Sequence, residues 1–127
     1  MTEVFDLDAN QDSLLTEKSY LADGVVAIVV HDVVPWSILR EQDFRGEVDP
    51  SIFAFSDNAW RQPVDHAVVE VLPEVQRADA PTRLGVSEGE AYTRLHELHY
   101  GTNGELLAVS TVAVDSSYVS FEVFRRR

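Results

Sequence analysis

Two stretches of this chain, one in each half, carry nearly the same pattern, and this repeat constrains the fold more than any other feature. Residues 17–34 read EKSYLADGVVAIVVHDVV, and residues 97–114 read ELHYGTNGELLAVSTVAV. In each copy an alternating arm passes through a Gly-containing turn into a long apolar run. Asp-Gly and Asn-Gly at the turns supply the positive φ angles that tight hairpins require. The repeat therefore predicts two duplicated long β-hairpins.

The return strands of the two hairpins, residues 25–34 and 105–114, are apolar at almost every position. Strands with this composition are usually covered on both faces. We therefore expect helices on one face of the sheet, and a ligand or a second subunit on the other.

Three segments carry helix signals: residues 35–44, 49–60 and 79–85. A proline opens the first of them, which suits a first helical turn. Asp49 or Ser51 can cap the second. The third has Asp79 as its N-cap, Pro81 in its first turn and Gly85 at its end. The sequence thus predicts three short helices.

Two more segments predict strands. Residues 64–75 favour a strand broken by Pro73, and residues 117–124 alternate between two sets of side chains near the end of the chain. Together with the hairpins they predict an α+β fold. Its sheet is mostly antiparallel, with about six strands built from two duplicated long hairpins, and short helices pack on one face. Residues 1–127 are expected to form a single domain.

Composition excludes several classes of protein. The chain has a net charge of −12 and no cysteine, which excludes disulfides and thiolate chemistry. A charge of this size repels a phosphate backbone, so we expect no direct binding to nucleic acid. No apolar stretch approaches the roughly 18 residues of a membrane span, and the acidic N-terminal residues are no signal peptide. We therefore expect a cytoplasmic protein that does not contact membranes and holds no cofactor.

A series of motifs in a particular order carries a family resemblance. The second half of the chain contains Leu84-Gly85, Gly89, Asn103-Gly104 and Ser110. The first half contains YLADG at residues 20–24, Pro35 and SIF at residues 51–53. In this order and spacing, residues 12–124 resemble a UTRA domain, the effector-sensing module of HutC-type GntR transcription regulators. The resemblance implies the fold of chorismate lyase, whose internal duplication would explain the repeated pattern.

The chain departs from that family at several positions. The family's regulators normally begin with a winged helix-turn-helix, to which nothing in this chain corresponds. The first strand and helix of the usual sensor domain are also expected to be missing or shrunk. Sugar-phosphate-sensing members carry two Arg where this chain has Lys18 and Tyr20, and Glu where it has Val30 and Ala108. The anion-binding chemistry of those members is therefore mostly absent.

The resemblance implies a ligand site between the first hairpin and the helix that starts near residue 49. The positions that match effector contacts of the family are Lys18, Tyr20, Ser51, Phe53 and Ser110. Lys18 and the helix start could hold a small carboxylate, while Tyr20 and Phe53 cover an apolar remainder. The alternative is that the two aromatic residues are core, Ser110 is a satisfied hydroxyl and Lys18 is exposed.

Catalytic and metal-binding patterns are weak. His96 and His99 stand three residues apart on an expected strand, so they point to opposite faces and cannot chelate one metal together. The same spacing separates Arg94 from Glu97, which we interpret as a solvated hairpin edge. No Cys and no Gly-x-Ser-x-Gly elbow is present. We expect neither catalysis nor a metal site.

Two functions of different classes remain. The first is a small-molecule-sensing and dimerising domain of, or related to, a GntR/HutC-type regulator, without its own DNA-binding head. The second is a ligand-free dimerisation or interaction module. A chorismate lyase-like enzyme is the least supported alternative. In either leading case we expect a homodimer, because the apolar return strands and the strand at residues 117–124 would otherwise leave exposed apolar surface and an open edge.

Overall fold

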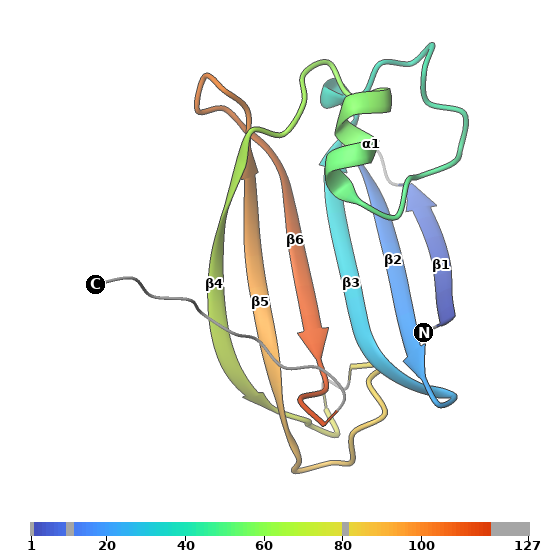
Figure 1. The fold of residues 1–127 in the computed structure, drawn as a ribbon, viewed down its shortest axis with the longest axis vertical. Coiled ribbons are helices and arrows are strands. Elements are labelled where there is room, and N and C mark those ends of the chain that lie inside the picture. The colour runs from blue at the N-terminus through green and yellow to red at the C-terminus, as the bar shows by residue number, and fades with distance from the viewer. Residues whose placement is uncertain (1, 10–11, 80–81, 118–127) are drawn as a thin grey trace.

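The computed structural model describes residues 2–9, 12–79 and 82–117, the first of these ranges by its backbone alone. Six strands and two short helices make up the described chain (Figure 1). The strands are β1 (Thr2–Ala9), β2 (Ser13–Ala22), β3 (Val25–Pro35), β4 (His66–Val75), β5 (Ala91–Tyr100) and β6 (Leu106–Val114), and the helices are η1 (Trp36–Ile38) and α1 (Ile52–Ala59). No helix within the described ranges is long and apolar enough to cross a membrane.

The strands form one antiparallel sheet in the order β1-β2-β3-β6-β5-β4. Each half of the chain contributes a three-stranded meander, and the halves meet where β3 pairs with β6. His31 lies opposite Thr111 in that pair, and the sequence repeat aligns the same two residues. The predicted α+β fold, with a six-stranded antiparallel sheet built on two duplicated hairpins, is therefore confirmed.

The sixth strand is not the one that the sequence pattern predicted. Strand β1 pairs with β2 along its whole length, although the N-terminal residues were expected to hold no full strand. The prediction of a shrunken first strand was wrong because the run VFDLDA alternates apolar and acidic residues, which suits a strand at the edge of a sheet. The strand predicted over residues 117–124 lies, apart from Ser117, outside the described residues.

The sequence repeat aligns the return strands β3 and β6 correctly. It aligns the first strands of the hairpins, β2 and β5, one residue out of register. Lys18 of β2 lies opposite Val30, and Glu97 of β5 lies opposite Ser110. Val30 and Ser110 are equivalent in the repeat, so Lys18 is equivalent to Glu97. The repeat as read from the sequence instead matched Glu17 to Glu97. A shift of one residue moves a strand's side chains to the other face of the sheet. The repeat as read from the sequence therefore matched residues that lie on opposite faces.

Irregularities in the arms follow the same structural register. The pairing shifts between Tyr20 and Leu21 in the first hairpin and between His99 and Tyr100 in the second. With Lys18 matched to Glu97, Tyr20 corresponds to His99, so the two shifts fall at equivalent positions. The duplication therefore includes its β-bulges.

Both predicted turns are present, with different geometries. At the first tip Asp23 and Gly24 have φ of 54° and 77°. At the second tip only Gly104 has a positive φ, of 80°, and the Asn103 side chain instead accepts a hydrogen bond of 3.0 Å from the backbone N–H of Glu105. The Asn side chain thus stabilises this turn through an Asx-type contact.

Only one of the three predicted helices forms as an α-helix. Helix α1 begins after its N-cap Ser51, as expected. The segment at residues 35–44 forms only the single turn of η1. Of the helix expected at residues 79–85, residues 79 and 82–85 are non-helical and the two between lie outside the described ranges. Pro73 does not break β4, because this strand is at the edge of the sheet and one side of it needs no ladder hydrogen bonds.

Gly85 has a different role from the predicted helix end. Its backbone N–H donates to the Val26 carbonyl at 2.9 Å, which draws the loop at residues 82–90 against β3. A Cβ at Gly85 would lie 2.2 Å from Cγ1 of Val25. The position therefore needs glycine for close approach.

Two apolar clusters lie on the two faces of the sheet, one cluster at each end of the strands. One surrounds α1 and consists of Leu14, Val34, Ile38, Leu39, Phe55, Ala59, Trp60, Val64, Leu107 and Ala108. The rings of Phe55 and Trp60 meet edge to face there, with centroids 5.7 Å apart. The other cluster lies under the loop at residues 82–90 and consists of Val29, Leu84, Tyr92 and Ala113, with Val26 and Val86 against it.

Helix α1 leaves much of its own face uncovered. Eight helical residues span about 12 Å, whereas a ten-residue strand spans about 33 Å. Next to the N-terminal end of α1, the same face of the sheet carries Lys18, Asp32, Glu97 and Ser110. We call this face of the sheet the site face. Helix α1 and the candidate cavity therefore share one face, whereas helices were expected on one face and a ligand or a second subunit on the other.

Replacement of Gly85 by Ala should destabilise the fold. The new methyl group would collide with the β-branched Val25, and overpacking of this kind costs about 1–3 kcal/mol. Urea unfolding of Gly85→Ala should show this loss, and Ser87→Ala in the same loop should not. In a Val25→Ala background the cost should shrink, because the colliding methyl is gone. Equal stability of Gly85→Ala and the parent chain would refute the close approach.

Candidate functional site

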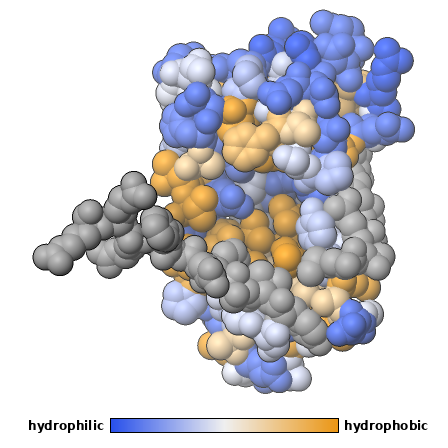
Figure 2. All heavy atoms as spheres, viewed as in Figure 1, coloured by the Kyte–Doolittle hydropathy of each residue, from blue (hydrophilic) through white to orange (hydrophobic). Residues whose placement is uncertain are grey.

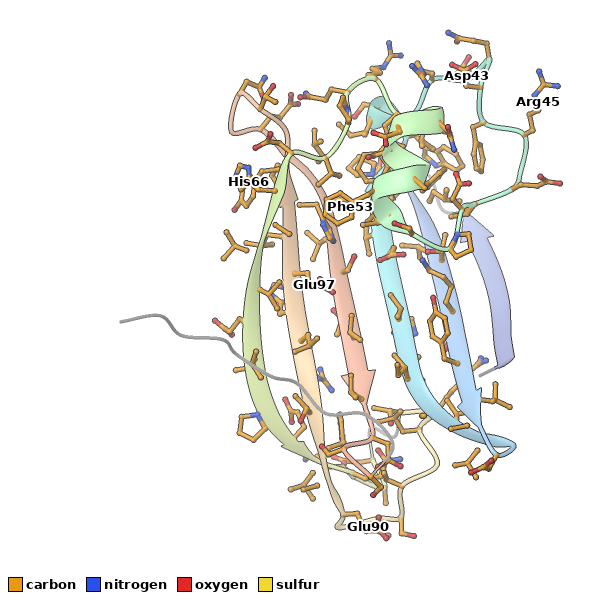
Figure 3. The ribbon with its side chains drawn as sticks, viewed as in Figure 1. Asp43, Arg45, Phe53, His66, Glu90 and Glu97 are labelled. Atoms are coloured by element: carbon orange, nitrogen blue, oxygen red, sulfur yellow. The ribbon has the colours of Figure 1, made fainter. Side chains whose placement is uncertain are left out.

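The candidate site is a cavity of about 170 Å³ between the start of α1 and the site face of the sheet. Its polar lining consists of Lys18, Asp32, Glu97, His99 and Ser110, and its aromatic and apolar lining of Tyr20, Val30, Pro50, Ile52, Phe53, Ala67 and Val112. Figure 2 shows this side of the molecule, with hydrophilic residues over the upper end and apolar residues across the middle. Figure 3 shows Phe53 at the lower end of α1, above Glu97 on β5.

A buried carboxylate organises the polar lining. Asp32 of β3 accepts hydrogen bonds from Thr16 Oγ1 at 3.3 Å and from the Ser110 hydroxyl, and it pairs with Lys18 Nζ at 3.3 Å. All four residues are buried. Charge in such a site must be paired and hydrogen-bonded to be tolerated. The carboxylate therefore ties together β2, β3 and β6.

Lys18 also holds the start of the helix. Its ammonium donates to the Pro50 carbonyl at 2.6 Å, immediately before the N-cap of α1. The side chain is only 3% exposed, although lysine is almost never fully buried unless it is paired. One ammonium thus links the sheet to the helix layer, with both Asp32 and a backbone carbonyl as acceptors.

The hydrogen bonds define the tautomer of His99. Its Nε2 lies 2.9 Å from Ser110 Oγ. The Ser110 hydroxyl has one hydrogen, which it donates to Asp32, so it accepts the hydrogen of His99 Nε2. Burial lowers the pKa of His99 against an opposing effect of Asp32, which favours the neutral ring. Nδ1 then carries a lone pair, and this buried atom has no hydrogen-bond partner in the described part of the chain.

Glu97 has a raised pKa, mainly because its carboxyl group is desolvated and secondly because Asp32 is near. No hydrogen bond or ion pair joins its carboxylate to any described residue. The interpretation of Glu97 as part of a solvated hairpin edge was wrong, since β5 lies between β4 and β6 within the sheet. Arg94 lies on the opposite face as expected, where it donates to the Tyr92 hydroxyl at 2.9 Å.

The structure brings four of the five predicted site residues to one cavity: Lys18, Tyr20, Phe53 and Ser110. Phe53 is 49% exposed, so it is not part of the core. Ser51 is exposed at the N-cap of α1 and does not line the cavity. Binding of a ligand by these residues stays a prediction.

Sequence reasoning missed three lining residues: Asp32, Glu97 and His99. One signal was available, because Asp32, together with His31 before it, interrupts a return strand that is otherwise apolar and was expected to be covered on both faces. Glu97 was assigned to a solvated hairpin edge and His99 was considered only as a metal ligand, and the repeat gave no correction because it matched the arms one residue out of register. No group of three His, Cys, Asp or Glu that could hold a metal ion occurs among residues 2–9, 12–79 and 82–117.

Glu97→Gln should stabilise the protein at neutral pH. The raised pKa means that the folded state binds more protons than the unfolded state between the two pKa values, so stability falls as the pH rises through that range. Glutamine removes the desolvated charge. Thermal unfolding should show a higher Tm than the parent at neutral pH, and the gain should vanish below the unfolded-state pKa. Glu70→Gln, on the exposed edge strand β4, should show no such gain.

Comparison with known proteins identifies the fold. No family model matches the sequence, and none of the curated proteins compared with it matches. Solved structures do. A GntR-family transcriptional regulator from Enterococcus faecalis V583 superposes with a TM-score of 0.74 at 15% identity, over 98% of this chain and 96% of that one.

Two further structures are similar in the same way. The possible transcriptional regulator YydK from Bacillus subtilis gives a TM-score of 0.73 at 12% identity, over 99% of this chain and 60% of that one. The ligand-binding domain of a GntR-family regulator from Bordetella bronchiseptica gives 0.70 at 8% identity, over 99% and 87%. At these identities the likeness establishes the fold, so the chain has the fold of the effector-binding domains of GntR-family transcription regulators.

Proposed function

We propose that this chain is the small-molecule-sensing domain of, or a relative of, a GntR/HutC-type transcription regulator, that it is a UTRA domain, and that it works as a dimer in the cytoplasm. The observation that carries the proposal is the cavity between α1 and the site face, whose lining holds the buried His99 Nδ1 without a described hydrogen-bond partner beside the partly buried Glu97 carboxylate. Unpaired buried polar atoms cost free energy, and functional sites are where proteins retain such costs. The chain itself does not bind DNA in this proposal, in keeping with its charge of −12.

The geometry favours binding over catalysis. In a serine nucleophile the neighbouring base accepts the hydroxyl proton. Here the Ser110 hydroxyl donates to Asp32 and accepts from His99, so His99 is not placed as its base. The polar groups therefore support recognition of a ligand. The lyase-like alternative gains nothing from them, because Arg94 and Glu97 lie on opposite faces of β5 and only Glu97 lines the cavity.

The position of the cavity gives a ligand contact with both layers of the domain. Pro50, Ile52 and Phe53 belong to the start of α1, whereas Ser110 and Glu97 belong to the sheet. A ligand that contacts both layers stabilises one spacing between them. Binding can thus shift the position of the helix, which is the kind of differential contact that a sensing domain needs.

The interaction-module alternative keeps one observation in its favour. Four valines of β4 are about half exposed or more: Val68, Val69, Val71 and Val75. Apolar side chains on both faces of an edge strand suit contact with another protein. The same strand also supports the dimer within the leading proposal.

A screen of small molecules tests the sensing function. Ligands should raise the Tm of the parent chain in proportion to their occupancy. Phe53→Ala should weaken a true hit roughly 10-fold, because it removes an aromatic wall worth on the order of 1–2 kcal/mol. Val33→Ala, on the other face of the sheet, should leave affinity unchanged. Hits that bind both variants equally would place the site elsewhere. Lys18 is a poor probe, since its loss leaves Asp32 buried without its counter-ion.

Light scattering tests the dimer. The expected mass is twice the 14.2 kDa of the chain at micromolar concentration. Val71→Lys, at the most exposed of the four valines, should shift the mass toward that of one chain if β4 lies in the interface. A mass of one chain for the parent protein would contradict dimerisation in both candidate functions.

A further inference from the structure

The charges that line the cavity are unbalanced. Its ionisable groups are Lys18, Asp32, Glu97 and His99. Lys18 and Asp32 neutralise one another at 3.3 Å, and the second acceptor of the ammonium is the Pro50 carbonyl. His99 is neutral in the tautomer described above. The carboxylate of Glu97 is therefore the one charge in the cavity lining without a counter-ion among the described residues.

Two lining residues offer acceptors that have no described partner. Glu97, which is partly buried, offers two carboxylate oxygens, and His99 offers the buried Nδ1 lone pair from a side chain that is 2% exposed. The two residues are separated by one position on β5, so they project from the same face about 7 Å apart along the strand. The Ser110 hydroxyl and Lys18 both already donate within the network around Asp32.

We propose that the cavity recognises a small amine, amidine or guanidine, whose N–H groups donate to Glu97 and His99 and whose apolar remainder lies against Phe53 and Tyr20. This inference rests on the proposed sensing function and specifies its ligand class. A cationic nitrogen with several N–H donors satisfies both acceptors and supplies the missing counter-charge. The cavity of about 170 Å³ is smaller than the roughly 300–1,000 Å³ of drug-sized sites, so the ligand is small.

A carboxylate is the less suitable occupant, although Lys18 and the helix start first suggested one. Its charge would lie beside Glu97 and Asp32, and like charges at close range in a desolvated site repel strongly. Ser51, which was expected to help hold it, does not line the cavity. The net charge of −12 acts in the same direction at longer range, since it attracts cations and repels anions.

Three compounds of matched size and different charge test the ligand class: benzylamine, benzyl alcohol and benzoate. Calorimetry at neutral pH and low salt should show that benzylamine binds and that benzoate binds at least 10-fold more weakly. Glu97→Gln should weaken benzylamine about 10- to 100-fold, as expected for loss of a charged hydrogen bond. Glu70→Gln, the same change on the far side of exposed strand β4, should leave its affinity unchanged. Thermal unfolding of each variant verifies that it is folded.

The outcomes separate the ligand class from the sensing function. If benzoate or benzyl alcohol binds more tightly than benzylamine, and Phe53→Ala weakens that binding, the amine class is wrong and the sensing site stands. If benzylamine binds Glu97→Gln as tightly as the parent, the assigned contact is wrong. If none of the three compounds binds at millimolar concentration, the result counts against both proposals and favours the interaction module.

Discussion

The ion pair between Lys18 and Asp32 is the interaction on which the rest of this structure depends. Asp32 accepts hydrogen bonds from Thr16 and Ser110, and Ser110 accepts one from His99. With Lys18, this network around one carboxylate connects four neighbouring strands. Through the Pro50 carbonyl, the ammonium extends this connection to α1. Buried charges are stable only when both partners are present, so these elements must assemble together. The cavity is a consequence of that assembly, because the lysine holds the start of the helix beside the part of the sheet that α1 does not cover.

The site arises where the internal duplication has lost its symmetry. Equivalent positions hold Lys18 and Glu97 on the arms, and Tyr20 and His99 two residues later. Asp32 corresponds to a valine in the other half. One half therefore supplies a complete ion pair, and the other supplies Glu97 and His99 Nδ1, two acceptors without a described partner. In a symmetric duplication each polar group would have an equivalent partner in the other half. Here the two halves differ, and the acceptors without a described partner lie together in one cavity at the junction of the halves.

Local signals in the sequence predicted much of the fold. The hairpin tips at Gly24 and Gly104 and the N-cap of α1 at Ser51 follow from backbone preferences that act over a few residues. Predictions failed where tertiary position overrides those preferences. Pro73 is tolerated because β4 is an edge strand, and Gly85, expected to end a helix, instead allows a loop to approach β3. The edge location of Pro73 and the contact of Gly85 with β3 both depend on residues distant in the chain, so neighbouring residues do not predict them.

The sequence by itself determined that this chain forms two duplicated hairpins in an antiparallel sheet. Its resemblance to UTRA domains further implied a common site for Lys18, Tyr20, Ser51, Phe53 and Ser110, of which all but Ser51 line one cavity. Alternation, turn residues and apolar composition are local properties, so they can be read without knowledge of the partners. Only the tertiary structure decided which face each side chain occupies, because a difference of one residue between the two turns changes the register of the second arm. That register brings Glu97 and His99 into the cavity beside Asp32. Their place in the cavity and their unsatisfied acceptors depend on contacts between strands from opposite halves of the chain, and no local pattern encodes them.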